Sequence, residues 1–332
     1  MSALYIATLD GGHGLKARVM SYGATLLNLW APDRYGTSRD VVLGFDAPEG
    51  WLGAHPYFGA TIGRYANRIA RAELPLDRRD HALMANEGRN QLHGGLRGFD
   101  KVGWAPFDEG PHHVRFRYVS ADGDQGFPGE LVAELTYRLG DDVLEMEWAA
   151  TCDAPTVVNL TNHAYWNLAG KGDVLGHELE LFASRFLPVN DELLPTGALR
   201  AVEDTPMDFF LPRRIGARLD ENEVQLRLAS GGYDHCWVLD GGPIAARLVE
   251  PRSGRGFELS TTQPGLQFYS GNQLDGSLRG KDSVAYAKYA GLCLEPQHFP
   301  DSPHHAHFPS TALRPGERYL QRASYRFFVD AT

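Results

Sequence analysis

The sequence predicts an all-β fold, namely a large antiparallel β-sandwich with few short helices. Two observations carry this prediction. Apolar and polar residues alternate through several segments, as in strands with one buried and one solvated face. These segments are separated by turn-forming residues, which belong to a set of 37 glycines and 20 prolines in a chain of 332 residues. Long helical periodicity is missing, so the pattern favours packed sheets over layers of helices.

The alternation is clearest in four segments, in which hydrophobic side chains recur at every second residue: 114–118, 131–139, 144–148 and 323–329. Residues 207–222 are expected to hold only short helical turns, because Pro212 and Gly216 interrupt any longer helix. No stretch has the composition of a linker. We therefore predict one domain that spans residues 1–332.

Composition excludes several classes of function. The formal net charge is −10 and no basic block occurs, which argues against nucleic acid and anionic membranes as partners. No apolar run approaches the ~20 residues of a membrane span, and residues 1–10 lack the pattern of a signal peptide. Cys152, Cys236 and Cys293 form no CxxC pair, so neither a disulfide framework nor a zinc motif is expected. We therefore expect a cytoplasmic protein.

The most informative stretch covers residues 156–170, TVVNLTNHAYWNLAG. It begins as a β-branched apolar run and then gathers Asn, Thr, His, Tyr and Trp within a few residues. Small polar groups beside aromatic faces suit a sugar, which is polar at its edge and apolar on its ring face. Taken alone, His163 would more often be a hydrogen-bonded core histidine. The functional interpretation therefore depends on the other polar segments.

Four further segments place polar residues among apolar ones. Asn67 and Arg68 lie in GRYANRIA, His93 in a Gly-rich turn, Asp234 in GYDHCWVL and Gln267 beside aromatic residues. Each one alone has a structural alternative, such as an ion pair or a residue that closes a turn. The Gly-rich turn lacks the GxxxxGK[ST] pattern of a phosphate loop. Sequence position by itself does not decide between these interpretations.

Glu295 follows the fully apolar run of residues 291–294. We expect it at the end of a buried strand, where loss of hydration disfavours the ionised carboxylate unless it has a partner. Such burial raises the pKa of a carboxyl group and makes Glu295 a candidate general base.

Taken together and in this order, six segments resemble the aldose 1-epimerase (galactose mutarotase) family: GRYANRIA, NQLHGGLRGFDKVGW, TNHAYWNLAG, YDHCWVL, TTQPGLQFYSGN and CLEPQHFPDSPHH. The resemblance extends over nearly the whole chain. It implies a β-sandwich of the mutarotase type with the sugar in an open cleft. By position in these motifs, His163 would be the proton donor and Glu295 the proton acceptor. The implied sugar contacts are Asn67, Arg68, His93, Tyr165, Asp234 and Gln267.

The activity that the resemblance implies is interconversion of the α and β anomers of free aldohexoses, such as D-galactose and D-glucose. The implied partner is a small sugar, with no metal and no other cofactor, and the chain would be a monomer or a weak homodimer. Two alternatives stay open. A carbohydrate-binding protein without catalysis would use similar side chains, and a hexose 6-phosphate 1-epimerase would use nearby cations such as Arg64, Arg68 and Arg97.

Overall fold

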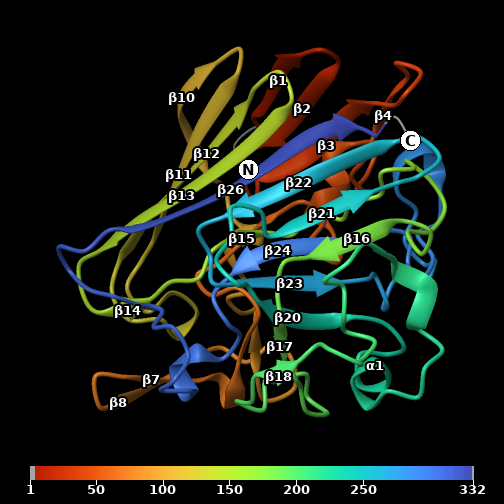
Figure 1. Cartoon of the computed structure of the whole chain (residues 1–332). Coiled ribbons are helices and arrows are strands. Elements are labelled where there is room, and N and C mark those ends of the chain that lie inside the picture. The colour runs from red at the N-terminus through yellow and green to blue at the C-terminus, as the bar shows by residue number, and fades with distance from the viewer. Residues whose placement is uncertain (1–3, 331–332) are drawn as a thin grey trace.

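The computed structural model describes residues 4–330 and is built mainly from antiparallel sheets (Figure 1). Residues 1–3 and 331–332 of the predicted domain lie outside this range. The largest sheet has nine strands. In spatial order these are β10 (Ala105–Gly110), β11 (His113–Ser120), β12 (Leu131–Leu139), β13 (Val143–Cys152), β26 (Tyr319–Val329), β22 (Arg255–Thr261), β21 (Ala246–Val249), β16 (Glu178–Leu181) and β19 (Arg213–Arg214).

Two smaller sheets accompany it. The five-stranded sheet runs in the order β18 (Arg200–Ala201), β17 (Arg185–Leu187), β20 (Asp234–Val238), β23 (Gly265–Tyr269), β24 (Cys293–Gln297). The four-stranded sheet contains β1 (Ile6–Gly12), β2 (Leu15–Met20), β3 (Thr25–Pro32) and β4 (Ser38–Asp40). Short antiparallel pairs join β5 (Thr61–Ile62) to β15 (Thr161–Asn162), β6 (Arg68–Ile69) to β9 (Gln91–Leu92), β7 (Glu73–Leu76) to β8 (Arg79–Ala82), and β14 (Thr156–Val157) to β25 (Ala312–Leu313).

The all-β prediction is confirmed, and the four alternating segments lie in β11, β12, β13 and β26. Within residues 4–330 the single α-helix is α1 (Val224–Leu228). None of the described helices is long and apolar enough to cross a membrane. Residues 207–222 contain β19 and one short 3₁₀ turn. The 3₁₀ turns are η1 (Pro48–Leu52), η2 (Ala70–Ala72), η3 (Phe99–Lys101), η4 (Asp124–Gly126), η5 (Ile215–Arg218), η6 (Lys281–Ser283) and η7 (Ser302–His304).

The main hydrophobic core joins the nine-stranded and five-stranded sheets. Trp237, Phe268 and Leu294 of the smaller sheet belong to the same buried cluster as Leu259 and Tyr325 of the larger one. The hydroxyl of Tyr325 also donates a hydrogen bond of 3.2 Å to the carbonyl of Leu294. Burial of these side chains stabilises the sandwich and leaves the other face of the five-stranded sheet for polar residues.

The expected position of Glu295 at a strand end is wrong, because it lies in the middle of β24. The strand continues since its side chains alternate: Leu294 joins the core, while Glu295 belongs to the opposite face. Pro296 does not interrupt it, because β24 is an edge strand of its sheet and an edge tolerates a missing N–H donor.

Candidate active site

One cavity of about 500 Å³ is lined by all eight side chains that the sequence predicts for the site. Their segments lie far apart in the chain, so the fold brings them together. Placement in a cavity is a structural finding, while the individual roles remain predictions. The eight residues are Asn67, Arg68, His93, His163, Tyr165, Asp234, Gln267 and Glu295.

The polar face of the five-stranded sheet contributes three of these side chains. Gln267 in β23 is the register partner of Glu295 in β24, and Asp234 lies in β20 on the other side of β23. Cross-strand partners project from the same face, and so do residues two apart along one strand. Nε2 of Gln267 donates a hydrogen bond of 2.7 Å to Oδ1 of Asp234. Strand register therefore assembles this polar surface.

The β6–β9 pair contributes Arg68, and the residues next to its two strands contribute Asn67 and His93. The backbone N–H of His93 donates to the carbonyl of Asn67 at 3.0 Å, and the N–H of Asn67 donates to Nδ1 of His93 at 3.2 Å. Burial lowers the pKa of His93 well below its usual value, so the ring is neutral. Because Nδ1 accepts, the ring proton lies on Nε2 and can be donated to a ligand oxygen.

The glycine after His93 explains how two predicted segments meet. Gly94 has a φ of +83°, and a Cβ at this position would lie 1.9 Å from the carbonyl oxygen of Gly63. Only glycine allows this approach, which holds the LHGG turn against the GRYANRIA segment.

His163 and Glu295 form the central pair, with 3.7 Å between Nε2 and Oε1. Both side chains are buried. Burial lowers the pKa of His163 to about 3, and burial together with the nearby Asp234 raises the pKa of Glu295 well above its usual value. Both shifts favour the same state, in which His163 is neutral and Glu295 holds one proton. The cavity therefore contains an acid and a base 3.7 Å apart, within reach of one ligand.

Two buried acceptor atoms in the cavity have no hydrogen-bond partner among the described residues. They are Oε2 of Glu295 and Oε1 of Gln267. A buried acceptor without a donor costs about 1–3 kcal/mol. A donor that reached either oxygen would offset this cost.

Aromatic rings hold the imidazole of His163. Tyr165 stacks on it with ring centroids 5.1 Å apart, and Tyr57 stacks at 5.5 Å. Tyr57 was missed by the sequence analysis, as were His55 and Glu87, which also line the cavity. The segment AHPYF around Tyr57 combines His, Pro and Tyr, but it has no periodic pattern that distinguishes it from an ordinary loop.

Comparison with known proteins shows the family of this chain. The sequence profile of the Aldose 1-epimerase family matches residues 5–326. The chain belongs to the aldose 1-epimerase family. It is 44% identical to galactose mutarotase from Bos taurus, over 95% of this chain and 92% of that protein. It is 39% identical to aldose 1-epimerase from Escherichia coli K12, over 98% and 95% of the two chains.

Solved structures of similar proteins have the same fold. The GalM/aldose epimerase homologue from C. elegans superposes with a TM-score of 0.93 at 34% identity and covers 99% of this chain and 100% of its own. Galactose 1-epimerase from Lactobacillus acidophilus gives a TM-score of 0.87 at 28% identity, with coverage of 98% and 95%. The mutarotase-type sandwich that the sequence resemblance implied is thereby confirmed.

One group of residues around the His163–Glu295 pair has the composition of a metal centre. Ligand atoms of His163, Cys293 and Glu295 lie within 4.8 Å of one another. The Cys293 thiol is 3.5 Å from Nδ1 of His163, and burial raises its pKa well above the usual value. The thiol lies against Nδ1 of His163, while Oε1 of Glu295 lies 3.7 Å from Nε2, so the two side chains approach different nitrogens of the ring. These contacts therefore do not converge on one point between the three residues.

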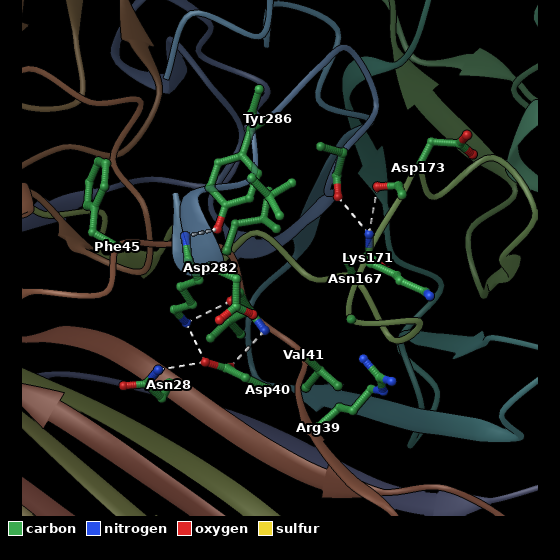
Figure 2. A pocket seen from close by; sticks show the side chains of 18 of the residues that line it. Asn28, Arg39, Asp40, Val41, Phe45, Asn167, Lys171, Asp173, Asp282 and Tyr286 are labelled. Carbon is green, nitrogen blue, oxygen red and sulfur yellow. Dashed lines mark hydrogen bonds and ion pairs between the residues drawn. The ribbon is translucent and has the colours of Figure 1, made fainter. Parts of the chain in front are cut away.

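Figure 2 shows a larger cavity, of about 590 Å³, whose lining includes Asn28, Asp40 and Tyr286. None of the eight predicted residues lines it, although Tyr286 borders both cavities. Its floor holds an ion pair of 2.6 Å between Lys281 and Asp40. Lys281 also donates to two backbone carbonyls, and Asp40 also accepts from Asn28, so these buried groups are already satisfied. The larger cavity is therefore not the predicted site.

Proposed function

We propose that this chain interconverts the α and β anomers of free aldohexoses, such as D-galactose and D-glucose, by acid/base opening and closure of the ring. The observation that carries the proposal is the buried His163–Glu295 pair in a cavity lined by hydroxyl-binding side chains. Membership of the aldose 1-epimerase family supports the same reaction. The chain would thus be an isomerase.

Ring opening needs one group to remove the proton of the C1 hydroxyl and another to protonate the ring oxygen as the C1–O bond breaks. We assign removal to Glu295 and donation to His163. Rotation about C1–C2 then presents the other face of the carbonyl, and closure reverses the two proton transfers. Each general catalyst contributes about 10²–10⁴-fold to the rate. The pair needs one shared proton throughout.

Sugar binding supplies a reason for this proton to move to His163. A hydroxyl that donates to Oε2 of Glu295 favours the carboxylate form and lowers its pKa. The resulting ion pair at 3.7 Å then favours the protonated imidazole. Of the remaining side chains, Arg68 and His93 would donate to sugar oxygens and Asp234 would accept from hydroxyls, while Asn67, Tyr165 and Gln267 would complete the contacts.

The charges of the cavity favour a free sugar over a sugar phosphate. Of the three arginines considered for phosphate, only Arg68 lines the cavity, and its guanidinium is paired with Glu87. Arg64 is buried elsewhere among backbone carbonyls, and Arg97 is exposed outside the cavity. Phosphate recognition normally uses unpaired cations or N–H donors.

A polarimetric assay tests the proposal. Freshly dissolved α-D-galactose and α-D-glucose should reach anomeric equilibrium much faster with the protein than without it, and the rate should survive exhaustive chelation with EDTA. Glucose 6-phosphate should be a poorer substrate. A carbohydrate-binding protein would leave every rate at its spontaneous value. Restoration of lost activity by a divalent metal would contradict the cofactor-free mechanism.

The pH dependence follows from the two pKa shifts. The pair must hold one proton, so activity falls when His163 takes up a second one or Glu295 loses the last. Because burial lowers the pKa of His163 to about 3 and raises that of Glu295, we expect no acid limb in kcat/KM near the ordinary histidine pKa of about 6.5. Activity should decline on the alkaline side. Polarimetry at a series of pH values measures this, and an acid limb centred near pH 6.5 would contradict it.

The proposal also covers domain organisation, oligomeric state and cellular location. We propose that residues 1–332 form one domain, as a monomer or weak homodimer, in the cytoplasm. The largest core cluster supports a single domain, because its residues come from the whole range between Ala7 and Phe327. The three cysteines support a cytoplasmic location, because all three are free thiols, as expected in a reducing compartment.

A further inference from the structure

We propose that Glu87 makes this site selective for uncharged sugars by forming a bidentate ion pair with the guanidinium of Arg68. The inference rests on the proposed epimerase activity and adds a residue that restricts its substrates. Neither the sequence motifs nor the catalytic pair suggests this role. It follows from how the one cationic residue in the cavity lining is held.

Arg68 is the single Arg or Lys among the described residues that line the catalytic cavity. Its Nε lies 2.6 Å from Oε2 of Glu87, and its Nη2 lies 2.7 Å from Oε1. This is a bidentate pair in which both carboxylate oxygens are used. The arginine side chain is 7% exposed and the glutamate side chain is 35% exposed. Glu87 therefore lies on the solvent side of the guanidinium and covers it.

A bidentate fork is also how arginine binds the carboxylate of a uronic acid or a phosphate group. With Glu87 in place, these donors are taken, and only Nη1 of Arg68 has no hydrogen-bond acceptor in the described protein. A single free N–H₂ group suits a neutral hydroxyl. An anionic sugar would meet Glu87 and the half-buried Asp234 without a free cation to compensate for them.

Glu87 can be changed without disturbing other contacts. Its side chain bonds to Arg68 alone, and its backbone is held separately by paired hydrogen bonds with Asn90, at 3.2 Å and 2.9 Å. Loss of the carboxylate therefore frees the guanidinium while the turn remains. The main effect is on charge and on the donors available to a ligand.

The chain offers a matched control in Glu192. It makes a forked ion pair with Arg89, with distances of 3.0 to 3.3 Å, and its side chain is 33% exposed, close to the value for Glu87. Neither residue of this pair lines the catalytic cavity. Glu192→Gln thus removes one charge from a forked pair whose arginine is 67% exposed and lies in the same 87–90 turn, so it also controls for any loosening of that turn.

The experiment compares D-galactose with D-galacturonate, which carries a carboxylate at C6. Anomerisation of each sugar is followed by polarimetry in the wild-type protein, Glu87→Gln, Glu87→Ala and Glu192→Gln, with spontaneous rates subtracted. The measured quantity is kcat/KM for galacturonate divided by kcat/KM for galactose. Both Glu87 variants should raise this ratio about tenfold or more, because removal of a like charge beside a freed arginine favours the anion. Glu192→Gln should leave it unchanged.

The ratio is taken within one protein sample, so a partly unfolded fraction cancels and a loss of stability cannot imitate the effect. A ratio in both Glu87 variants within about twofold of the wild-type value, or an equal rise in Glu192→Gln, would overturn the inference. Failure of the wild-type protein to accelerate galactose anomerisation would instead overturn the proposed function. The two failures are therefore distinguishable.

Discussion

Glu295→Gln should lower kcat for galactose anomerisation by about 10²-fold or more, the usual cost of losing a general base. The substitution keeps the shape of the side chain and its ability to accept a hydrogen bond, but it removes the basic carboxylate. Because Glu295 lies in β24 with one unpartnered acceptor atom, an amide fits the same space. The variant should therefore fold and still bind sugar. Polarimetry beside a thermal melt measures both properties.

Glu147→Gln is a suitable control, since Glu147 pairs with Arg322 on the exposed side of β13, away from the cavity. It should retain the wild-type kcat. His163→Asn should behave like Glu295→Gln, and the double variant should lose less than the product of the two single losses, because both groups act on one shared proton. A folded Glu295→Gln protein with near-normal kcat would remove Glu295 from the mechanism.

Arg64→Ala should lower the free energy of unfolding by about 3–5 kcal/mol, the scale for deleting a buried charged group that several partners depend on. Arg64 is almost fully buried, and burial lowers its pKa to about 10. Its two terminal nitrogens donate to the carbonyls of Pro128, Gly129, Ser120 and Ala121 and to the hydroxyls of Ser120 and Thr156. The substitution removes these donors, and the acceptors of Ser120, Gly129 and Thr156 are bonded to Arg64 in buried surroundings.

Urea denaturation measures this loss, and polarimetry on the folded fraction should show a nearly unchanged KM, since Arg64 does not line the cavity. Arg97→Ala is the matched control. Arg97 is exposed and its side chain has no partner among the described residues, so its removal should change the unfolding free energy by less than about 0.5 kcal/mol. A similar stability for both variants would show that the Arg64 network contributes little.

The two arginines of GRYANRIA illustrate what local sequence can and cannot decide. Arg64 and Arg68 lie four residues apart in one motif, and the sequence suggests both as cations that a sugar phosphate could use, with Arg68 also an implied sugar contact. The fold buries Arg64 among carbonyls of distant loops and directs Arg68 to the cavity with Glu87. The partner of a polar side chain is set by segments remote in the chain, which no local pattern contains. For the same reason the sequence does not indicate that Glu87 and Tyr57 line the cavity.

The sequence by itself determined the all-β class and the four long alternating strands, and the resemblance of its motifs to the aldose 1-epimerase family named the residues that meet in one cavity. Period-two alternation is a local property, and it is strong where one face of a strand is buried. Only the tertiary structure decided which strands are neighbours, that Glu295 lies within β24, and that His163 faces it at 3.7 Å. Strand order and the burial of each group depend on packing between distant segments, and that burial, rather than residue type, sets the pKa values on which the proposed chemistry depends.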